Sequence, residues 1–482
     1  MSRTRFVVSL FACCVLFAAF CQTTAAWTLC VNPAGSNGCY SKIQDAVNHA
    51  SANDVIEVGP GTYKEYVTIG KPVSIIGAGA ESSIIDATNF AHGFFVDGFD
   101  HPGLKNVTLT GFTVENAMFE GIVVVSAWDV IINDNHVINN DKSPGLVFTG
   151  ALSGCPDQPG NDMYENDETG DCGGAIHLIG TVNVIVSDNL ITGNADGILI
   201  SDETAESHNN LIIRNVVKDN PLECGIVLAS HPRAGHLTPK TFAPHFGVDN
   251  NTVAENISAA NGVKIGGSGV GFFSDGAGPG RVSGNVAIRN KLTDNGLGGV
   301  ALHTHVGPAF NLPADNMDGN MIIGNYIAGN LADTADTATP GRVGININSG
   351  SGGSPVLGTV ISQNVIRDED VDIAVNTPAE VDIHLNDLLG DKIGVADVCA
   401  FDKASVCTGS IDATENYWGC VQGPNKDGCT TTSGSDIRFT PWLHKSVVAD
   451  ERDHGNDAAN FGPADLWPVM RLGVPQRRRC LS

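Results

Sequence analysis

The sequence predicts an all-β solenoid, in which short parallel strands wind into stacked coils. The first observation is a repeat read as LIIRNVVKDN (211–220), TVAENISAAN (252–261), VAIRNKLTDN (286–295) and MIIGNYIAGN (321–330). Each copy has one asparagine in its middle and a second five residues later. The second observation is that runs of three or four β-favouring residues alternate with Asn, Gly or Asp and show no helical periodicity. Because no run can bury its apolar side alone, stacking must supply the core.

Further copies place Asn135 with Asn140 and Asn189 with Asn194, and near the end Asn364 is followed by Glu369 in the second position. Asparagine at a bend tolerates left-handed backbone angles, and its amide can bond to the asparagine of the next coil. We therefore expect ladders of asparagine through the turns. The offset of 26 residues from Asn189 to Asn215 indicates coils of about 22 to 26 residues with loop insertions.

This repeat resembles the right-handed parallel β-helix of the pectate lyase superfamily, and the resemblance covers most of the chain after its first residues. It implies a single-stranded right-handed β-helix, an N-terminal capping helix and a sugar-binding groove on one strand face. The segment SKIQDAVNHAS (41–51) has Ile43, Ala46 and Val47 on one face, and Ser41 is a candidate N-cap. We expect this amphipathic helix to cover the first coil, whose sheet edges are otherwise exposed.

Residues 1–26 predict a secretory signal peptide, since Arg3 and Arg5 precede an apolar run and Ala25-Ala26 follows. The run is too short for a membrane span. Residues 27–444 are expected to form the β-helix with its closing coils, and residues 445–482 a loosely structured tail. The product is expected to be a monomer that is secreted or periplasmic.

The charge balance argues against nucleic acid as a partner. Without Arg3 and Arg5, 25 basic residues remain against 53 acidic ones, a net charge of −28. A surface of that charge repels nucleic acid and anionic membranes. It would bind a polyanion tightly only with Ca²⁺ as a bridge.

Close cysteine pairs support export, because short loops between paired cysteines are typical of disulfides in exported proteins. Cys224 and Cys480 are left over. The expected disulfides join Cys30 to Cys39, Cys155 to Cys172, Cys399 to Cys407, and Cys420 to Cys429.

One strand of each coil can be aligned on the glycine that begins it. Inward positions are then Ile176, Ile200, Leu228, Phe272, Leu302 and Ile347. Outward positions are His177, Ser201, Ala229, Phe273, His303 and Asn348. Two residues further on stand Glu203, His231, Asp275 and His305, which stacking should bring into one column.

This column borders the long insertions 141–171, 232–249 and 306–317, and long loops on a rigid solenoid commonly carry function. Glu203, Asp275 and His231 are the candidate catalytic residues. His177, His303 and His305 are candidate substrate ligands. The competing interpretation is that these side chains only satisfy strand ends and turns.

The acidic loop between Cys155 and Cys172 is a candidate Ca²⁺ site, with a solvated loop as the alternative. Its residues are Asp157, Asp162, Glu165, Asp167, Glu168 and Asp171.

The sequence names no reaction. The strand column has no Arg or Lys of the kind that serves as base in lyases of this fold, no Asp-Pro-His-Glu run of uronate epimerases, and no hydrolase-type cluster of three aspartates. We expect an exported carbohydrate-active protein, a polysaccharide hydrolase or lyase. The alternative is a non-catalytic β-helix that binds glycans or a partner through the same face.

Overall fold

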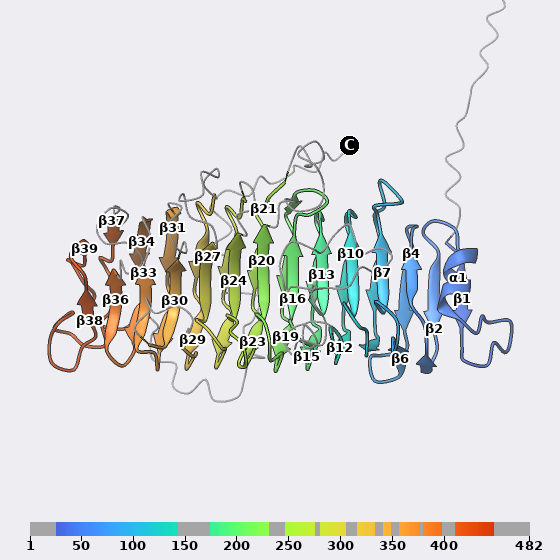
Figure 1. Ribbon diagram of the computed structural model, residues 1–482, viewed down its shortest axis with the longest axis horizontal. Helices are drawn as coiled ribbons and strands as arrows, with labels where there is room; N and C mark the ends of the chain where they lie inside the picture. The colour runs from blue at the N-terminus through green and yellow to red at the C-terminus, as the bar shows by residue number, and fades with distance from the viewer. Residues whose placement is uncertain are drawn as a thin grey trace, which may run out of the picture.

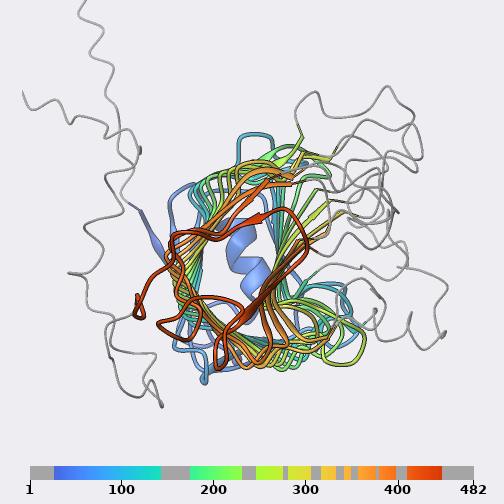
Figure 2. The ribbon, with the colours of Figure 1, turned by 90° about the vertical axis from the view of Figure 1, so that its left-hand side faces the viewer.

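The protein is a right-handed parallel β-helix elongated along its coil axis (Figure 1). The structure, a computed structural model, describes residues 26–142, 174–230, 246–274, 280–304, 316–332, 341–348, 356–375, 379–397 and 410–447. Within these ranges three long sheets run the length of the solenoid, and all their strand pairs are parallel. Seen along the axis, successive coils superimpose (Figure 2). No helix in these ranges is long and apolar enough to cross a membrane.

Sheet A begins each coil. Its fourteen described strands are β1 (Thr28–Val31), β2 (Val55–Val58), β5 (Ser74–Gly77), β8 (Thr108–Thr110), β11 (Ile131–Asn133), β14 (Ile185–Ser187), β18 (Leu211–Ile213), β22 (Thr252–Ala254), β25 (Val286–Ile288), β28 (Met321–Ile323), β31 (Val356–Ser362), β34 (Ala379–His384), β37 (Ser410–Asp412) and β39 (Ile437–Arg438).

Sheet B follows after the first turn. Its eleven described strands are β3 (Gly61–Tyr63), β6 (Ser83–Asp86), β9 (Thr113–Glu115), β12 (His136–Ile138), β15 (Leu190–Thr192), β19 (Val216–Lys218), β23 (Ile257–Ala259), β26 (Lys291–Thr293), β29 (Tyr326–Ala328), β32 (Val365–Arg367) and β35 (Asp387–Leu389).

Sheet C closes the coil. Its twelve described strands are β4 (Val67–Ile69), β7 (Phe94–Asp97), β10 (Ile122–Val125), β13 (Ile176–Ile179), β16 (Ile198–Ser201), β20 (Ile226–Ser230), β24 (Val270–Ser274), β27 (Val300–Thr304), β30 (Val343–Asn348), β33 (Val371–Val375), β36 (Ile393–Asp397) and β38 (Thr431–Ser433). A further pair joins β17 (Ser207–His208) to β21 (Val248–Asp249).

The core fills the inside of the coil and runs through it without a break. All six predicted inward residues, from Ile176 to Ile347, are fully buried in one hydrophobic cluster. Glycine before a sheet C strand permits the close stacking of coils, since a Cβ at Gly197 would lie 1.9 Å from the Gly225 carbonyl oxygen. Trp418 is also fully buried in this core, so it packs the last coil and offers no surface to a sugar.

The predicted asparagine ladders are present and buried. Each side-chain Nδ2 donates to Oδ1 of the next rung, as from Asn189 to Asn215 (2.9 Å) and from Asn215 to Asn256 (3.0 Å). The first ladder runs through Asn135, Asn189, Asn215, Asn256, Asn290, Asn325, Asn364, Asn386 and Asn416. The second contains Asn140, Asn194, Asn220, Asn261, Asn295 and Asn330. A third, which we did not predict, joins Asn210, Asn251, Asn285 and Asn320.

The backbone role assigned to the ladder asparagines was wrong. The left-handed residue is the one before the asparagine, as at Asp188 (φ 57°) and Arg214 (φ 55°), while Asn189 and Asn215 keep negative φ. A left-handed angle at a residue with a Cβ costs about 1 kcal/mol. The hydrogen bonds made by the side-chain amide of the following asparagine offset that cost at every turn.

The second ladder ends on a carboxyl group, because Glu369 accepts from the backbone N–H and Nδ2 of Asn330 at 3.0 and 2.9 Å. Glu369 is fully buried, and its other oxygen has no hydrogen-bond partner among the described residues. Burial raises the pKa of Glu369 to about 7. Burial likewise raises the pKa of Asp372 well above its usual range, and the nearby Glu369 adds to that shift.

A buried acid of this kind makes stability depend on pH. Since the folded pKa is raised above the unfolded one, the stabilising contribution is complete below about pH 4.5 and is lost as pH rises through about 7. Glu369→Gln keeps an acceptor for Asn330 and removes the charge. At pH 8 we expect the unfolding free energy of Glu369→Gln to exceed that of the wild type by up to about 3 kcal/mol. At pH 4 the two proteins should have the same unfolding free energy. The control Glu57→Gln, on the exposed surface of sheet A, should leave the unfolding free energy unchanged at both pH values. The same unfolding free energy for Glu369→Gln and the wild type at pH 8 would contradict the assignment.

The N-terminal helix α1 (Ile43–His49) lies at the first coil and contacts β1, β2 and β4, with Ile43, Ala46 and Val47 buried (Figure 2). Ser41 is not its cap. The N-cap position is Lys42, which makes no side-chain capping bond. The carboxylate of Glu65 accepts from the backbone N–H groups of Ile43 and Gln44 instead, at 2.9 and 3.1 Å. A residue 22 positions away thus satisfies the helix end, which local sequence could not reveal.

Two of the expected disulfides are present, Cys30–Cys39 and Cys420–Cys429, and Cys224 is free. Cys155, Cys172, Cys399, Cys407 and Cys480 lie outside the described residues. The two disulfides are typical of a protein that folds in an oxidising compartment. At the C-terminal end of the described chain, Ser446 and Val447 bind the carboxylate of Asp387.

Candidate functional site

The outer face of sheet C carries a group of buried titratable side chains, His92, Glu120 and His177. On strands β7 to β13 this face begins with a small apolar cluster of Phe95, Val123, Val125 and Ile179, packed against Tyr66 and Phe99. These residues alternate with inward ones such as Phe94 and Val124, as period-two strands require. The polar groups beside this cluster therefore lie in surroundings of low polarity.

Glu120 is the centre of the polar group. Its Oε2 lies 2.6 Å from Nδ1 of His92, and its Oε1 lies 3.4 Å from Nδ1 of His177. The other ring nitrogen of His177, Nε2, lies 2.7 Å from the Ser201 hydroxyl oxygen. Exposed fractions are 2% for His92 and 0% for Glu120, His177 and Ser201. Four side chains from four successive coils thus form one continuous buried network.

The register of sheet C explains how these residues meet. Phe94 pairs with Ile122, so His92 and Glu120, each two residues before its strand partner, stack on neighbouring coils. The intervening Gly93 and Gly121 are in close contact, since a Cβ at Gly93 would lie 2.8 Å from the Gly121 carbonyl oxygen. Sequence reasoning missed His92 and Glu120 because the strands were aligned from the glycine onward. A polar residue directly before that glycine in successive coils was the available signal.

The predicted column was misaligned at His177. His177 pairs with Leu199, whereas Ser201 pairs with Ile179, so His177 stands two residues earlier than the position assigned to it. It is also fully buried rather than displayed to solvent. The misalignment arose because two glycines, Gly173 and Gly174, precede this strand and either can be taken as its start.

Of the remaining predicted site residues, Glu203 and His303 belong to the part of the chain that the structure describes. Glu203 follows the end of β16 by two residues and is 7% exposed. Its neighbour Asp202 accepts from the Ser230 hydroxyl at 2.7 Å, which ties β16 to β20. The backbone of His303 lies in β27 and pairs with Phe273. His231, Asp275, His305 and the acidic loop 157–171 lie outside the described residues.

Tyr66 borders the network, its ring centre 5.5 Å from that of His92. Burial raises the pKa of Tyr66 to about 12, and the nearby carboxylates of Glu120 and Asp97 add to this shift. The phenol is therefore protonated at neutral pH and can act as a hydrogen-bond donor but not as a base.

The hydrogen bonds define what the network can do. A carboxylate only accepts, so Nδ1 of His177 carries the proton that it shares with Glu120, and Nε2 is left as an acceptor for the Ser201 hydroxyl. Nε2 is thus the position at which His177 takes up or returns a proton. A carboxylate that orients a histidine against a hydroxyl is an arrangement suited to acid–base or nucleophilic chemistry.

Comparison with known proteins agrees with this architecture. Residues 86–238 match the family model described as "Right handed beta helix region". The fold resembles the A-module of a mannuronan C-5 epimerase of Azotobacter vinelandii, with a TM-score of 0.52 and 13% identity over 84% of this chain and 94% of that one. No curated protein matches the sequence. The chain therefore has the right-handed parallel β-helix fold.

Two other solved structures share the architecture at lower similarity. The catalytic unit of an α-1,3-glucanase of Streptomyces thermodiastaticus has a TM-score of 0.45 and 14% identity over 83% of this chain and 65% of that one. A surface adhesin of Streptococcus pneumoniae has a TM-score of 0.42 and 10% identity over 75% of this chain and 91% of that one. A fold hosts many unrelated functions, so function must be argued from the site.

Proposed function

We propose that the protein is an exported carbohydrate-active enzyme whose reaction takes place on the outer face of sheet C. The observation that carries the proposal is the Glu120 carboxylate, which is fully buried and shared by His92 and His177. Burying a carboxylate costs several kcal/mol of desolvation, and the packing of the coils does not require one there. Buried, paired titratable groups of this kind gather at active sites. The A-module that this chain resembles is named for a reaction on a polysaccharide, which supports a glycan substrate.

Proton transfer is the chemistry that this network serves. Hydrolysis of a glycosidic bond and elimination both move a proton to or from a sugar oxygen or carbon. In our proposal His177 carries that proton on Nε2, and Glu120 is a positioning residue that keeps the proton on Nδ1. His92, on the second oxygen of Glu120, holds the carboxylate in place.

In an alternative arrangement the protons are transferred by Glu203 and Asp275 in place of His177, with His231 as the third catalytic candidate and His303 and His305 as substrate ligands. The strands that precede Glu203 and Asp275 in the sequence, β16 and β24, lie two coils apart, and a spacing of about 4.8 Å per coil makes that about 9 to 10 Å. Carboxyls about 6.5 to 9.5 Å apart suit an inverting glycosidase.

A second candidate function is ester hydrolysis on an acylated glycan. The distance of 2.7 Å between Ser201 Oγ and His177 Nε2 favours it. Ser201 Oγ would attack the acyl carbon while its proton passes to Nε2 and then to the departing sugar hydroxyl. Water would cleave the acyl-serine in the second half, again with His177 as base.

Two alanine variants separate these functions. If His177 acts on the sugar directly, His177→Ala should lower turnover about 10²- to 10⁴-fold, and Ser201→Ala should lower it less than about tenfold. If Ser201 is the nucleophile, both variants should lose turnover to a similar degree. The measurement is release of reducing ends, unsaturated products and free acyl groups from a polysaccharide panel. Full turnover by His177→Ala would refute both. A glycan that binds without being cleaved, with binding weakened by His303→Ala, would favour the non-catalytic alternative.

A further inference from the structure

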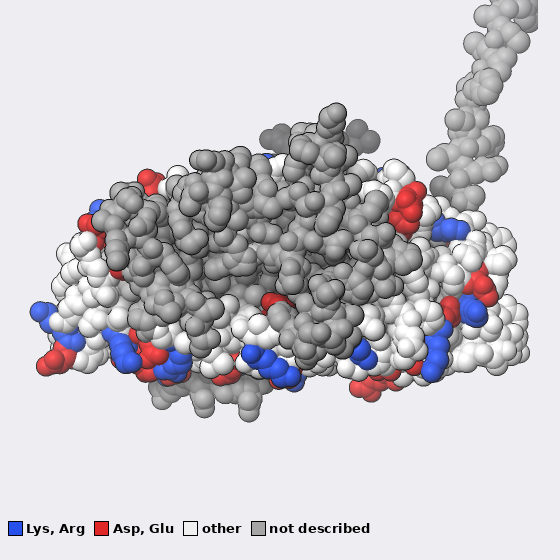
Figure 3. All heavy atoms as spheres, in the orientation of Figure 1, with Lys and Arg blue, Asp and Glu red and all other residues white. Residues whose placement is uncertain are grey.

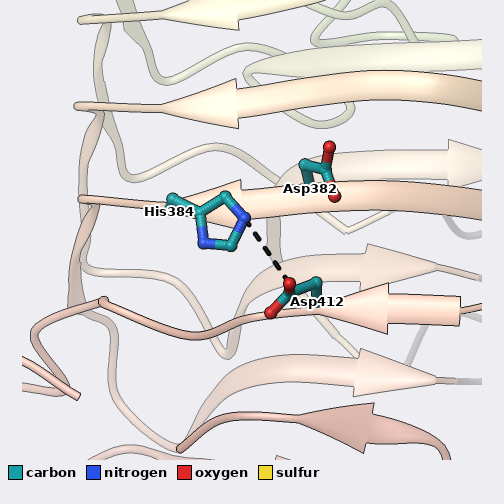
Figure 4. A group of neighbouring side chains, drawn as sticks. All are labelled: Asp382, His384 and Asp412. Carbon is teal, nitrogen blue, oxygen red and sulfur yellow. Dashed lines mark ion pairs between the residues drawn. The ribbon is translucent and has the colours of Figure 1, made fainter. Parts of the chain in front are cut away.

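A second group of potential ligands lies far from the sheet C site, on the outer face of sheet A near the end of the solenoid. Asp382 and His384 belong to β34, and Asp412 belongs to the adjacent β37. Asp382 and Asp412 are register partners, and one donor atom from each of the three residues lies within 4.8 Å of the others. Figure 4 shows the three side chains gathered over the same two strands.

The orientation of His384 leaves a lone pair directed at this group. Its Nδ1 lies 2.8 Å from the carbonyl oxygen of Thr414, and since a carbonyl only accepts, Nδ1 is the protonated nitrogen. Nε2 of the neutral ring is then unprotonated, and it lies 3.8 Å from Oδ2 of Asp412. A backbone carbonyl that fixes the far nitrogen of an imidazole is the usual support of a metal-binding histidine.

Asp412 is held in a similar way. Its Oδ1 accepts from the backbone N–H of Thr414 at 3.1 Å and from the Thr414 hydroxyl at 2.8 Å. Its Oδ2 faces His384 and forms an ion pair with the guanidinium of Arg438. The Arg438 side chain is 70% exposed, so it can move into solvent at little cost. A cationic group thus already pairs with Asp412, one of the three potential ligands.

We propose that Asp382, His384 and Asp412 bind one divalent transition-metal ion of the Zn²⁺ type, with Arg438 as the competing cation. Two ligands of a tetrahedral Zn²⁺ lie about 3.4 Å apart, so the His384–Asp412 separation needs only a small adjustment. Asp382 is exposed and free to rotate toward the ion. An imidazole donor favours Zn²⁺ over Ca²⁺, which takes six to eight oxygen ligands. Three protein ligands leave one position open to water. This site is independent of the proposed function, because it lies on another sheet.

Isothermal titration of the metal-free mature protein with Zn²⁺ tests the proposal. We expect His384→Ala to weaken this site at least tenfold or to remove one equivalent of Zn²⁺, and Arg438→Met to tighten it several-fold. The control His136→Ala, which removes a half-exposed histidine on sheet B, should bind Zn²⁺ as the wild type does. Melting of each variant in chelator should match the wild type, so that a loss of binding is not a loss of fold.

Wild-type stoichiometry and affinity in His384→Ala would overturn the proposal. So would weaker binding in Arg438→Met, because the guanidinium would then be a support of the site and not a competitor. Equal affinity of the site for Ca²⁺ and Zn²⁺ would also contradict it, since the histidine would then contribute nothing.

Discussion

Replacing Asn215 by leucine should lower the free energy of unfolding by about 4 kcal/mol. The Asn215 amide donates to Oδ1 of Asn256 at 3.0 Å and to the Val186 carbonyl at 2.9 Å. Its Oδ1 accepts from the backbone N–H and Nδ2 of Asn189 at 3.0 and 2.9 Å. Leucine fills a similar volume but leaves the Asn189 N–H and the Val186 carbonyl without partners in a buried turn. Each such group costs about 1 to 3 kcal/mol.

The measurement is the thermal or denaturant midpoint of the variant beside that of Asn133→Leu. Asn133 ends β11 of sheet A and is half-exposed, so its replacement should change the unfolding free energy by no more than about 0.5 kcal/mol. Equal midpoints for the two variants would mean that the buried ladder contributes no more to stability than a surface amide.

Glu120→Gln should lower turnover about 10²- to 10⁴-fold while keeping the shape of the side chain. One carboxylate oxygen lies against Nδ1 of His92 and the other against Nδ1 of His177. An amide has a single oxygen, so its NH₂ must face one of the two rings, and a donor facing Nδ1 of His177 forces the proton to Nε2. His177 would then present an N–H where the reaction needs a lone pair.

The matched control is Glu115→Gln, at the end of β9 on sheet B, which should retain full turnover. The pH dependence of the turnover rate is a further readout, because a purely structural role of Glu120 would leave it unchanged. If Glu120 only stabilises the fold, Glu120→Gln should melt at a lower temperature than the wild type. Its turnover rate should then equal that of the wild type at temperatures where the variant is folded. That result would remove Glu120 from the proposed mechanism.

The sequence predicted the solenoid well because its repeat is a physical requirement of the fold. A ladder asparagine must recur once per coil in the same turn, so Asn189, Asn215 and Asn256 are visible as a period even though insertions change the spacing. The inward residues followed from the same alignment. Basic and acidic side chains lie side by side along the lower edge of the described surface in Figure 3, and no sequence pattern predicted this.

The site was predicted only in part, because side chains meet across coils by register and not by sequence distance. Ser201 and His177 were placed on the right face, but the double glycine before β13 shifted His177 by two residues. Glu120 lies 57 residues from His177 and before its strand, where no alternation rule assigns a face. His384 and Asp412 were missed for a related reason, since β34 and β37 lack the glycine used for alignment.

The central claim is that polysaccharide chemistry takes place on the outer face of sheet C. The measurement that tests it most directly is product release from a panel of neutral, acidic and acylated polysaccharides by the wild type, by His177→Ala and by His136→Ala. The account predicts that at least one polysaccharide is turned over by the wild type and by His136→Ala, with His177→Ala slower by a factor of about 100 or more. Equal turnover by all three proteins would contradict it, as would no product from any polysaccharide with the folded wild type.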